Sequence, residues 1–183
     1  MFKFLIILLF SCIISAASGQ VKSADSVRVP KSYWVAGGLG LSSLGSISIM
    51  LGANAEIKNN ILISANLIGE TNQTFMSRPR HIVDLTSFNA LAGKIYKQRN
   101  SLISFSAGLG LVRVDRNDLD LFSKKTEISE TTVGIPLSIQ AYAIGFQTIG
   151  VGLNLYGNLN TKQSTAGIHL SVALGRIATR ARN

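Results

Sequence analysis

The sequence predicts an all-β protein, an eight-stranded antiparallel up-and-down transmembrane β-barrel that follows an N-terminal signal peptide. Three observations support this fold class. The chain opens with an export signal, its glycine-rich apolar segments alternate with period two, and short and long connections alternate between those segments. A tilted strand needs about 9–11 residues to cross a bilayer, and bacterial barrels have short periplasmic turns and longer outer loops.

Residues 1–19 are predicted to form a cleaved signal peptide. Lys3 provides a positive charge, an apolar run continues to Ile14, and small residues follow as far as Gly19. This order of basic, apolar and small residues is typical of secretory signals, and the apolar run is shorter than a membrane-spanning helix. We therefore expect the protein to be exported to the outer membrane.

The single cysteine, Cys12, lies inside this signal. Lipid attachment at Cys12 is one reading, but Phe10 is bulky for a lipoprotein processing box, and an ordinary signal-core cysteine is the alternative that we favour. The mature chain then has no internal disulfide and no thiolate metal site.

Alternating apolar residues mark the strands. In one segment Ile149, Val151, Leu153 and Leu155 fall on one side, and smaller or polar residues fall on the other. Such period-two alternation predicts a strand, and the glycine content of the uncharged stretches disfavours helices. We place strands at 32–42, 45–56, 61–70, 83–96, 102–114, 130–143, 146–159 and 164–176. The predicted organisation is a periplasmic segment at 20–31, the barrel at 32–176 and a C-terminal tail at 177–183.

The connections predict the orientation of the barrel. Those at 57–60, 97–101 and 144–145 are short, whereas 71–82 and 115–129 are long. Short turns belong to the periplasmic side. Several aromatic residues then arrive at the periplasmic end and predict half of an interfacial girdle, with Tyr156 the main candidate at the other end. The periplasmic set is Tyr33, Trp34, Tyr96, Tyr142 and Phe146.

Two features of the sequence do not fit the predicted barrel in a single way. The fourth strand has apolar residues on both parities, with Val83, Leu85, Leu91 and Ile95 on one and Phe88, Ala90 and Ala92 on the other, so either could face lipid. Pro136 has no N–H to donate to a strand ladder, which predicts a bulge or a local gap.

The later strands resemble those of the outer membrane protein β-barrel domain family. The resemblance rests on TVGIPLSIQAY at 132–142, on the glycine-spaced TIGVGLNLYGNL at 148–159, and on the closing GIHLSVALGRI at 167–177. It implies the same eight-stranded fold in a small bacterial outer-membrane protein. The chain departs from the commonest barrel ending because it has no terminal aromatic residue.

Two groups of residues are candidate sites. His169 and Ser171 have the His-x-Ser spacing of a lipid A deacylase, but no acidic residue follows Glu130, and a hydrogen-bonded lumen histidine is the alternative reading. The run from Asp115 to Asp120 could offer oxygens to calcium, but it lacks the glycine and the distant glutamate of a calcium loop. We therefore predict no catalytic, cofactor-binding or metal-binding residues.

The function predicted is that of a non-enzymatic outer-membrane barrel with a structural or surface-interaction role. A barrel of eight strands is filled by side chains, which excludes a general diffusion pore. The residues behind the net charge of +9 are scattered, so we do not expect nucleic acid as a partner. The partners that we do expect are outer-membrane lipids and an unidentified molecule at the cell surface, and we expect a monomer. The alternatives are a lipid-modifying enzyme and a soluble lipocalin-like barrel, whose apolar parity would face inward.

Overall fold

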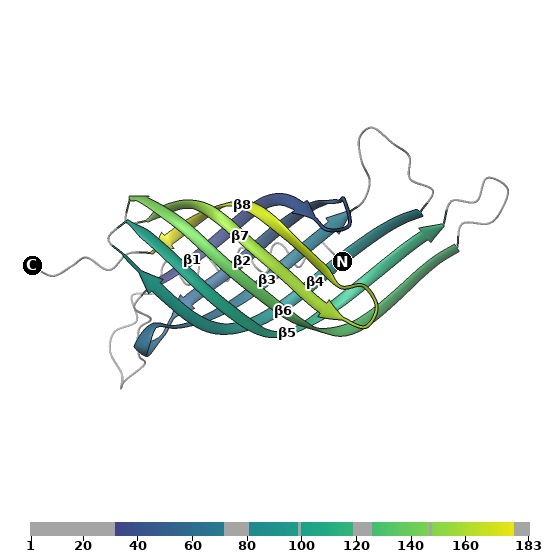
Figure 1. The fold of residues 1–183 in the computed structure, drawn as a ribbon, viewed down its shortest axis with the longest axis horizontal. Helices are drawn as coiled ribbons and strands as arrows, with labels where there is room; N and C mark the ends of the chain where they lie inside the picture. The colour runs from purple at the N-terminus through teal and green to yellow at the C-terminus, as the bar shows by residue number, and fades with distance from the viewer. Residues whose placement is uncertain (1–31, 72–80, 99, 119–125, 147, 178–183) are drawn as a thin grey trace, which may run out of the picture.

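The computed structural model describes residues 32–71, 81–98, 100–118, 126–146 and 148–177. Eight antiparallel strands close into a barrel in the order of the sequence, with β8 paired to β1 (Figure 1). One short 3-10 turn, η1 (Lys58–Asn60), joins β2 to β3. The strands are β1 (Ser32–Ser42), β2 (Ile47–Glu56), β3 (Ile61–Thr71), β4 (His81–Lys97), β5 (Ser101–Asp118), β6 (Thr126–Phe146), β7 (Ile149–Asn160) and β8 (Thr165–Arg176).

The two ends of the barrel differ. We call the turn end the one where β1 begins, β8 ends, and short connections join β2 to β3, β4 to β5 and β6 to β7. The opposite end is the loop end. There β4, β5 and β6 project beyond the other strands (Figure 1). The predicted fold and strand number are confirmed, and the two long connections, after β3 and after β5, both lie at the loop end as predicted, although the β1–β2 and β7–β8 connections there are short.

The predicted ranges of β4, β5 and β6 were too short, because they left out the part of these strands that projects at the loop end. The β4–β5 register continues to His81 opposite Asp118, and the β5–β6 register continues to Asp118 opposite Thr126. The strands on either side of these three stop earlier. On one side, β7 pairs with β6 only as far as Gly134. Charged residues in these extensions resemble a loop in the sequence, but paired strands outside a membrane need no apolar alternation.

The two faces of the barrel wall have opposite character. Polar side chains point into the lumen and are buried, among them Asn54, Asn66, Ser104, Gln140 and Asn154. Large apolar side chains on every strand point outward and are exposed, for example Leu39, Ile49, Ile63, Phe88, Leu109, Ile135, Leu153 and Leu170. No helix in the described part of the chain is long and apolar enough to span a membrane.

Burial shows which side of β4 faces outward. Leu85, Leu91 and Ile95 are buried in the lumen, whereas Phe88 is 55% exposed on the outside. The sequence left this open because the inward parity of β4 is as apolar as the outward one. Of these inward residues, Ile95 and Leu85 belong to two separate apolar clusters inside the barrel.

Pro136 coincides with a local gap in the ladder. Paired positions between β5 and β6 stop at Ala107 opposite Leu137 and resume at Gly110 opposite Gly134, without a change of register. The register shift in β6 lies elsewhere, between Ile144 and Phe146 on the side of β7. The proline therefore removes ladder pairing locally and does not insert an extra residue.

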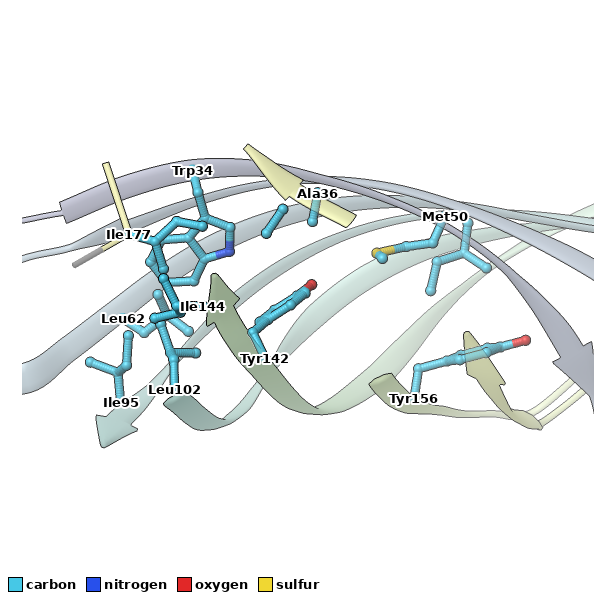
Figure 2. Packing of buried hydrophobic residues seen from close by; sticks show 12 residues of the cluster. Trp34, Ala36, Met50, Leu62, Ile95, Leu102, Tyr142, Ile144, Tyr156 and Ile177 are labelled. Atoms are coloured by element: carbon cyan, nitrogen blue, oxygen red, sulfur yellow. The ribbon is translucent and has the colours of Figure 1, made fainter. Parts of the chain in front are cut away.

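An apolar plug fills the lumen toward the turn end. Trp34, 2% exposed, lies in one buried cluster that draws residues from all eight strands and also contains Ile177, just after β8 (Figure 2). The plug members named in Figure 2 near Trp34 are Leu62, Ile95, Leu102, Tyr142, Ile144 and Ile177. From Tyr142 toward the loop end, the side chains that fill the lumen are mainly polar.

The plug corrects the predicted aromatic girdle. Trp34 and Tyr142 were expected at the membrane interface, but both point into the lumen and are buried. Tyr156, expected to face the opposite interface, is also a lumen residue. Tyr33 and Tyr96 do face outward, 48% and 60% exposed, and the side chain of Phe146 lies outside the described residues.

Candidate functional site

A hydrogen-bonded group of side chains spans the polar half of the lumen. His169 on β8 bonds through Nε2 to the Ser48 hydroxyl on β2 at 2.8 Å. The Tyr156 hydroxyl on β7 donates to the same Ser48 oxygen at 3.0 Å, and the Tyr156 ring stacks on the imidazole. Glu70 on β3 is the cross-strand neighbour of Ser48 and is also buried. We call Ser48, Tyr156 and His169 the lumen triad.

Among the described residues, the lumen triad differs in two respects from a nucleophilic catalytic site. Ser48 and His169 are both completely buried, so neither a lipid nor a soluble substrate reaches the serine hydroxyl. Within the described residues, Nδ1 of His169 has no hydrogen-bond partner, whereas a catalytic histidine is oriented by a group at that atom.

The predicted His-x-Ser pair shares the lumen face but does not interact. Ser171 lies beside the plug, where its hydroxyl is 3.3 Å from both the Tyr142 hydroxyl and the Gly152 carbonyl oxygen. The true partner of His169 is Ser48, which is 121 positions away in the sequence. No local spacing pattern could have indicated that contact. The register of the closed barrel creates it.

Neighbouring lumen residues continue the polar filling. Ser138 and Asn154 are hydrogen-bonded at 2.9 Å, as are Ser64 and Asn54 at 2.7 Å. A cavity of about 10 Å³ lies between β3, β4, β6 and β7, and a space of that size holds about one water molecule. Its lining includes Asn66, Ser87, Asn89, Pro136, Tyr156 and Asn158. The described lumen is therefore packed, as expected for eight strands.

An ion pair links β4 to β2 at the turn end of the lumen. The Lys97 ammonium on β4 contacts the Glu56 carboxylate on β2, and it also donates to the Ser32 hydroxyl on β1. Ser32 in turn donates to Glu56 at 2.7 Å. Lys97 and Glu56 are 20% and 4% exposed, so this link lies at the boundary between the lumen and the solvent.

The projecting strands carry the accessible polar groups of the loop end. On their outer side, Nε of Arg113 lies 3.0 Å from a carboxylate oxygen of Asp115. Hydrogen bonding from Ser129 and the neighbouring Arg113 guanidinium hold the pKa of Asp115 below its ordinary value. A second pair joins Lys162 of the β7–β8 connection to Glu130 of β6 at 2.9 Å, which lowers the pKa of Glu130.

An apolar cluster underlies these ion pairs. Leu85 on β4 and Val112 and Val114 on β5 are buried on the inner side of the projecting strands, with Val83 packed against them. Arg116 reaches from β5 toward the β7–β8 connection, where it donates to the Gln163 side chain at 3.4 Å. The projection is thus a packed sheet that is tied to the rest of the loop end.

The fold divides the run from Asp115 to Asp120 that was considered as a calcium site and not predicted to be one. Asp115 is engaged by Arg113 and Ser129, Asp118 ends β5, and Asp120 lies outside the described residues. Where the structure is described, no three acidic, histidine or cysteine side chains gather in a way that could hold a metal ion.

Comparisons with known proteins give the fold. No family model matches the sequence, and no curated protein matches it at a significant level. Among solved structures, the N-terminal barrel domain of OprF from Pseudomonas aeruginosa matches with a TM-score of 0.57 and 9% identity, over 80% of this chain and 98% of that one.

Two further structures match over a similar span. Neisserial surface protein A gives a TM-score of 0.54 and 19% identity, over 80% of this chain and 95% of that one. Ail, the attachment invasion locus protein of Yersinia pestis, gives 0.60 and 9% identity, over 80% of this chain and 99% of that one. The chain therefore has the closed eight-stranded fold of the small bacterial outer-membrane β-barrels.

Proposed function

We propose that this protein is a non-enzymatic β-barrel of the outer membrane that holds the projecting β4–β6 sheet at the cell surface for contacts with other molecules. In this proposal the barrel is an anchor with a packed lumen, and residues 1–19 are the signal that exports it. The observation that carries it is the contrast between an apolar outer wall and a polar, filled lumen.

The outer wall fits a hydrocarbon environment. Leu109, Leu111, Val133 and Leu170 are each more than half exposed, and all eight strands contribute large apolar side chains to the same outward face. Soluble monomers rarely expose continuous apolar surfaces of this extent. The lumen instead holds buried polar side chains, several of which are hydrogen-bonded to one another, such as Ser138 to Asn154 and Ser64 to Asn54. This inversion favours a membrane barrel over the soluble lipocalin-like alternative, whose apolar face lines the inside.

The filled lumen supports an anchor and argues against a pore. The apolar plug around Trp34 and Tyr142 occupies one half, and the lumen triad with its polar neighbours occupies the other. A solute would have to displace both. The burial of Ser48 and His169 likewise gives no support to a lipid-modifying enzyme.

The projecting sheet supports a role in surface contacts. Strands β4, β5 and β6 continue in paired register beyond β7 and present the Arg113–Asp115 pair on their outer side. Two of the structural neighbours carry names of a surface protein and of an attachment and invasion protein, and Ail has also been solved with a heparin analogue, sucrose octasulfate. Those properties belong to the neighbours, and they make surface adhesion the first activity to test here.

Envelope fractionation tests the location. The mature protein is expected with the outer membranes, and it should migrate differently on gels when unheated, because a closed strand ladder resists detergent. Recovery of the protein in the soluble periplasmic fraction contradicts the proposal.

Trypsin on intact cells tests the orientation. Cleavage is expected near Arg78, Arg80, Lys124 or Lys125, whose connections belong to the loop end in the topology. Lys58, Lys97 and Arg99, whose connections belong to the turn end, should be protected. The reverse pattern would mean that the projecting sheet faces the periplasm.

A further inference from the structure

We propose that the turn end of the barrel binds the headgroups of anionic phospholipids through two outward-facing cations, Lys94 and Arg176, each set beside an aromatic ring on the next strand. The inference rests on the proposed membrane location and adds a lipid class and a site to it. In the proposed orientation, these lipids are those of the periplasmic leaflet.

The first cation lies on β4. Lys94 is exposed on the outward face, directly opposite Phe105 on β5 and Ile61 on β3. Tyr96, two residues further toward the turn end, is 60% exposed, and its ring meets that of Phe105 edge to face, with centroids 6.3 Å apart. An ammonium group therefore lies at the level of an aromatic pair, where amphipathic rings occupy the headgroup region of a bilayer.

The second cation lies where the barrel closes. Arg176 is exposed near the end of β8, directly opposite Tyr33 on β1, which is 48% exposed on the same outward face. A guanidinium group presents several N–H donors in a planar fork that suits a phosphate, and a tyrosine hydroxyl beside it can donate a further hydrogen bond. Both cations thus combine a phosphate-binding charge with an interfacial ring.

The cations of the two ends differ in their partners. At the loop end, Arg113 and Lys162 are paired with carboxylates. At the turn end, Lys97 is paired with Glu56, but Lys94 and Arg176 form no ion pair with any described residue. Their charge is therefore available to a ligand.

The charge of the described barrel is divided between its ends. Around the turn end, Glu56 is the one carboxylate in the described residues, against the cations Lys58, Lys94, Lys97 and Arg176. Around the loop end, when the connections at 72–80 and 119–125 are included, the sequence has seven cations and seven carboxylates, so their charges balance. The turn end is thus the positive end, and the whole-chain charge of +9 conceals this polarity.

This polarity selects anionic over zwitterionic lipids. A phosphatidylcholine phosphate carries its own quaternary ammonium, which competes with a protein cation, whereas phosphatidylglycerol leaves its phosphate uncompensated. A basic residue near an anionic surface favours association by about fivefold. Averaged over all lipids that touch the barrel, two such residues should give about a twofold preference for phosphatidylglycerol.

Spin-labelled lipids measure this preference on the folded protein. The full mature chain is reconstituted in phosphatidylcholine bilayers with a trace of spin-labelled phosphatidylglycerol or spin-labelled phosphatidylcholine, and electron paramagnetic resonance gives the fraction of each label that is immobilised on the protein. The wild type is expected to prefer phosphatidylglycerol, and the preference should fall as salt is added. K94Q/R176Q should bind both labels equally.

Two matched variants test the assignment. K94R/R176K keeps both charges and should keep the preference. R113Q/D115N removes an ion pair at the loop end without changing the net charge and should also keep it. The unheated gel shift of each variant confirms that it has folded.

Three results overturn the inference. One is equal binding of the two labels by the wild type, another is a preference that survives in K94Q/R176Q, and the third is a preference lost in R113Q/D115N. With any of these, immobilised lipid would still be seen, and the membrane barrel would stand. If no lipid is immobilised at all, the proposed membrane location fails together with this inference.

Discussion

The imidazole of His169 stacks on the phenol ring of Tyr156, with ring centroids 4.5 Å apart and planes inclined by 13°. Both side chains also bond to Ser48, so one hydroxyl joins β2 to β7 and β8 across the lumen. Polar filling of this kind fixes the lumen by specific contacts, whereas the plug at the turn end fills it by shape alone. The two halves should respond differently to substitution.

Replacement of His169 tests the stacking and the hydrogen bond separately. H169F keeps a stacked ring but loses the bond to Ser48, and should lower the free energy of unfolding by about 1–2 kcal/mol. H169A also leaves a cavity and should cost about 2–4 kcal/mol. Urea titration in lipid vesicles, followed by the fluorescence of Trp34, measures both. Equal losses would show that the stack contributes nothing.

Neighbouring residues on β7 test the two faces of the wall. Leu153 is 47% exposed on the outside, and L153R places a charge near the middle of the membrane, at an expected cost of about 2–4 kcal/mol. Asn154 is completely buried in the lumen, where N154S loses volume and a bond but buries no charge in hydrocarbon, so it should cost less than L153R.

The same vesicle titration ranks two control variants on β7. L153A keeps the outer face apolar, so its stability should lie near that of the wild type. N154R brings a large group into a filled lumen and should fail on size. If L153R refolds as well as the wild type while both Asn154 variants fail, the apolar face points inward, and the membrane reading must be abandoned.

The ion pair at the turn end should show strong coupling. K97M removes the Lys97 ammonium from the buried Glu56 carboxylate and should cost about 2–4 kcal/mol. Because E56Q removes the charge that K97M exposes, the double variant E56Q/K97M should be more stable than the sum of the single losses predicts. A double-mutant cycle on unfolding free energies gives the coupling, and additive losses would argue that the pair is a surface contact of no consequence.

Acid should loosen the projecting sheet through Asp115. The bond from Ser129 and the charge of Arg113 lower the pKa of Asp115 from 3.8 in the folded state. A lowered pKa means that the stabilisation is complete above the ordinary value and is lost as the pH falls through the folded value.

Hydrogen exchange measures this loss site by site. Amide protection in β5 near Asp115 and in β6 near Ser129 should fall as the pH drops below 3.8, after correction for the intrinsic exchange rates. D115N should reduce that pH dependence while leaving the protection of β1 and β8 unchanged. An identical profile in D115N would assign the effect to other carboxylates of the sheet.

The sequence predicted the fold well because membrane strands repeat a simple pattern. Alternation located all eight strands, and β1 matches its predicted range of 32–42. The alternation of apolar and polar residues missed those parts of the strands that do not belong to the apolar outer wall. The ends of β5 and β6 lie beyond the apolar wall and are held by pairing alone, so their charges resembled a loop.

The position of aromatic and catalytic-looking residues was harder to predict. Trp34 and Tyr33 are adjacent in the sequence, yet one belongs to the lumen and the other to the outer face. Parity distinguishes the two only when the lumen is assumed to be polar throughout, and the plug at the turn end breaks that assumption. His169 was correctly placed in the lumen, but its contact with Ser48 depends on how β8 and β2 face each other across β1.

The position of Ile177 links the end of the chain to the first strand. It is completely buried in the cluster that contains Trp34, although β8 has ended one residue before it. Since the last strand must pair with the first before this side chain can reach its place, the interior near the turn end is completed only when the ring of strands shuts. A chain that stops short of this isoleucine would leave a hole beside the indole, so closure and sealing are one event in the assembly of the barrel.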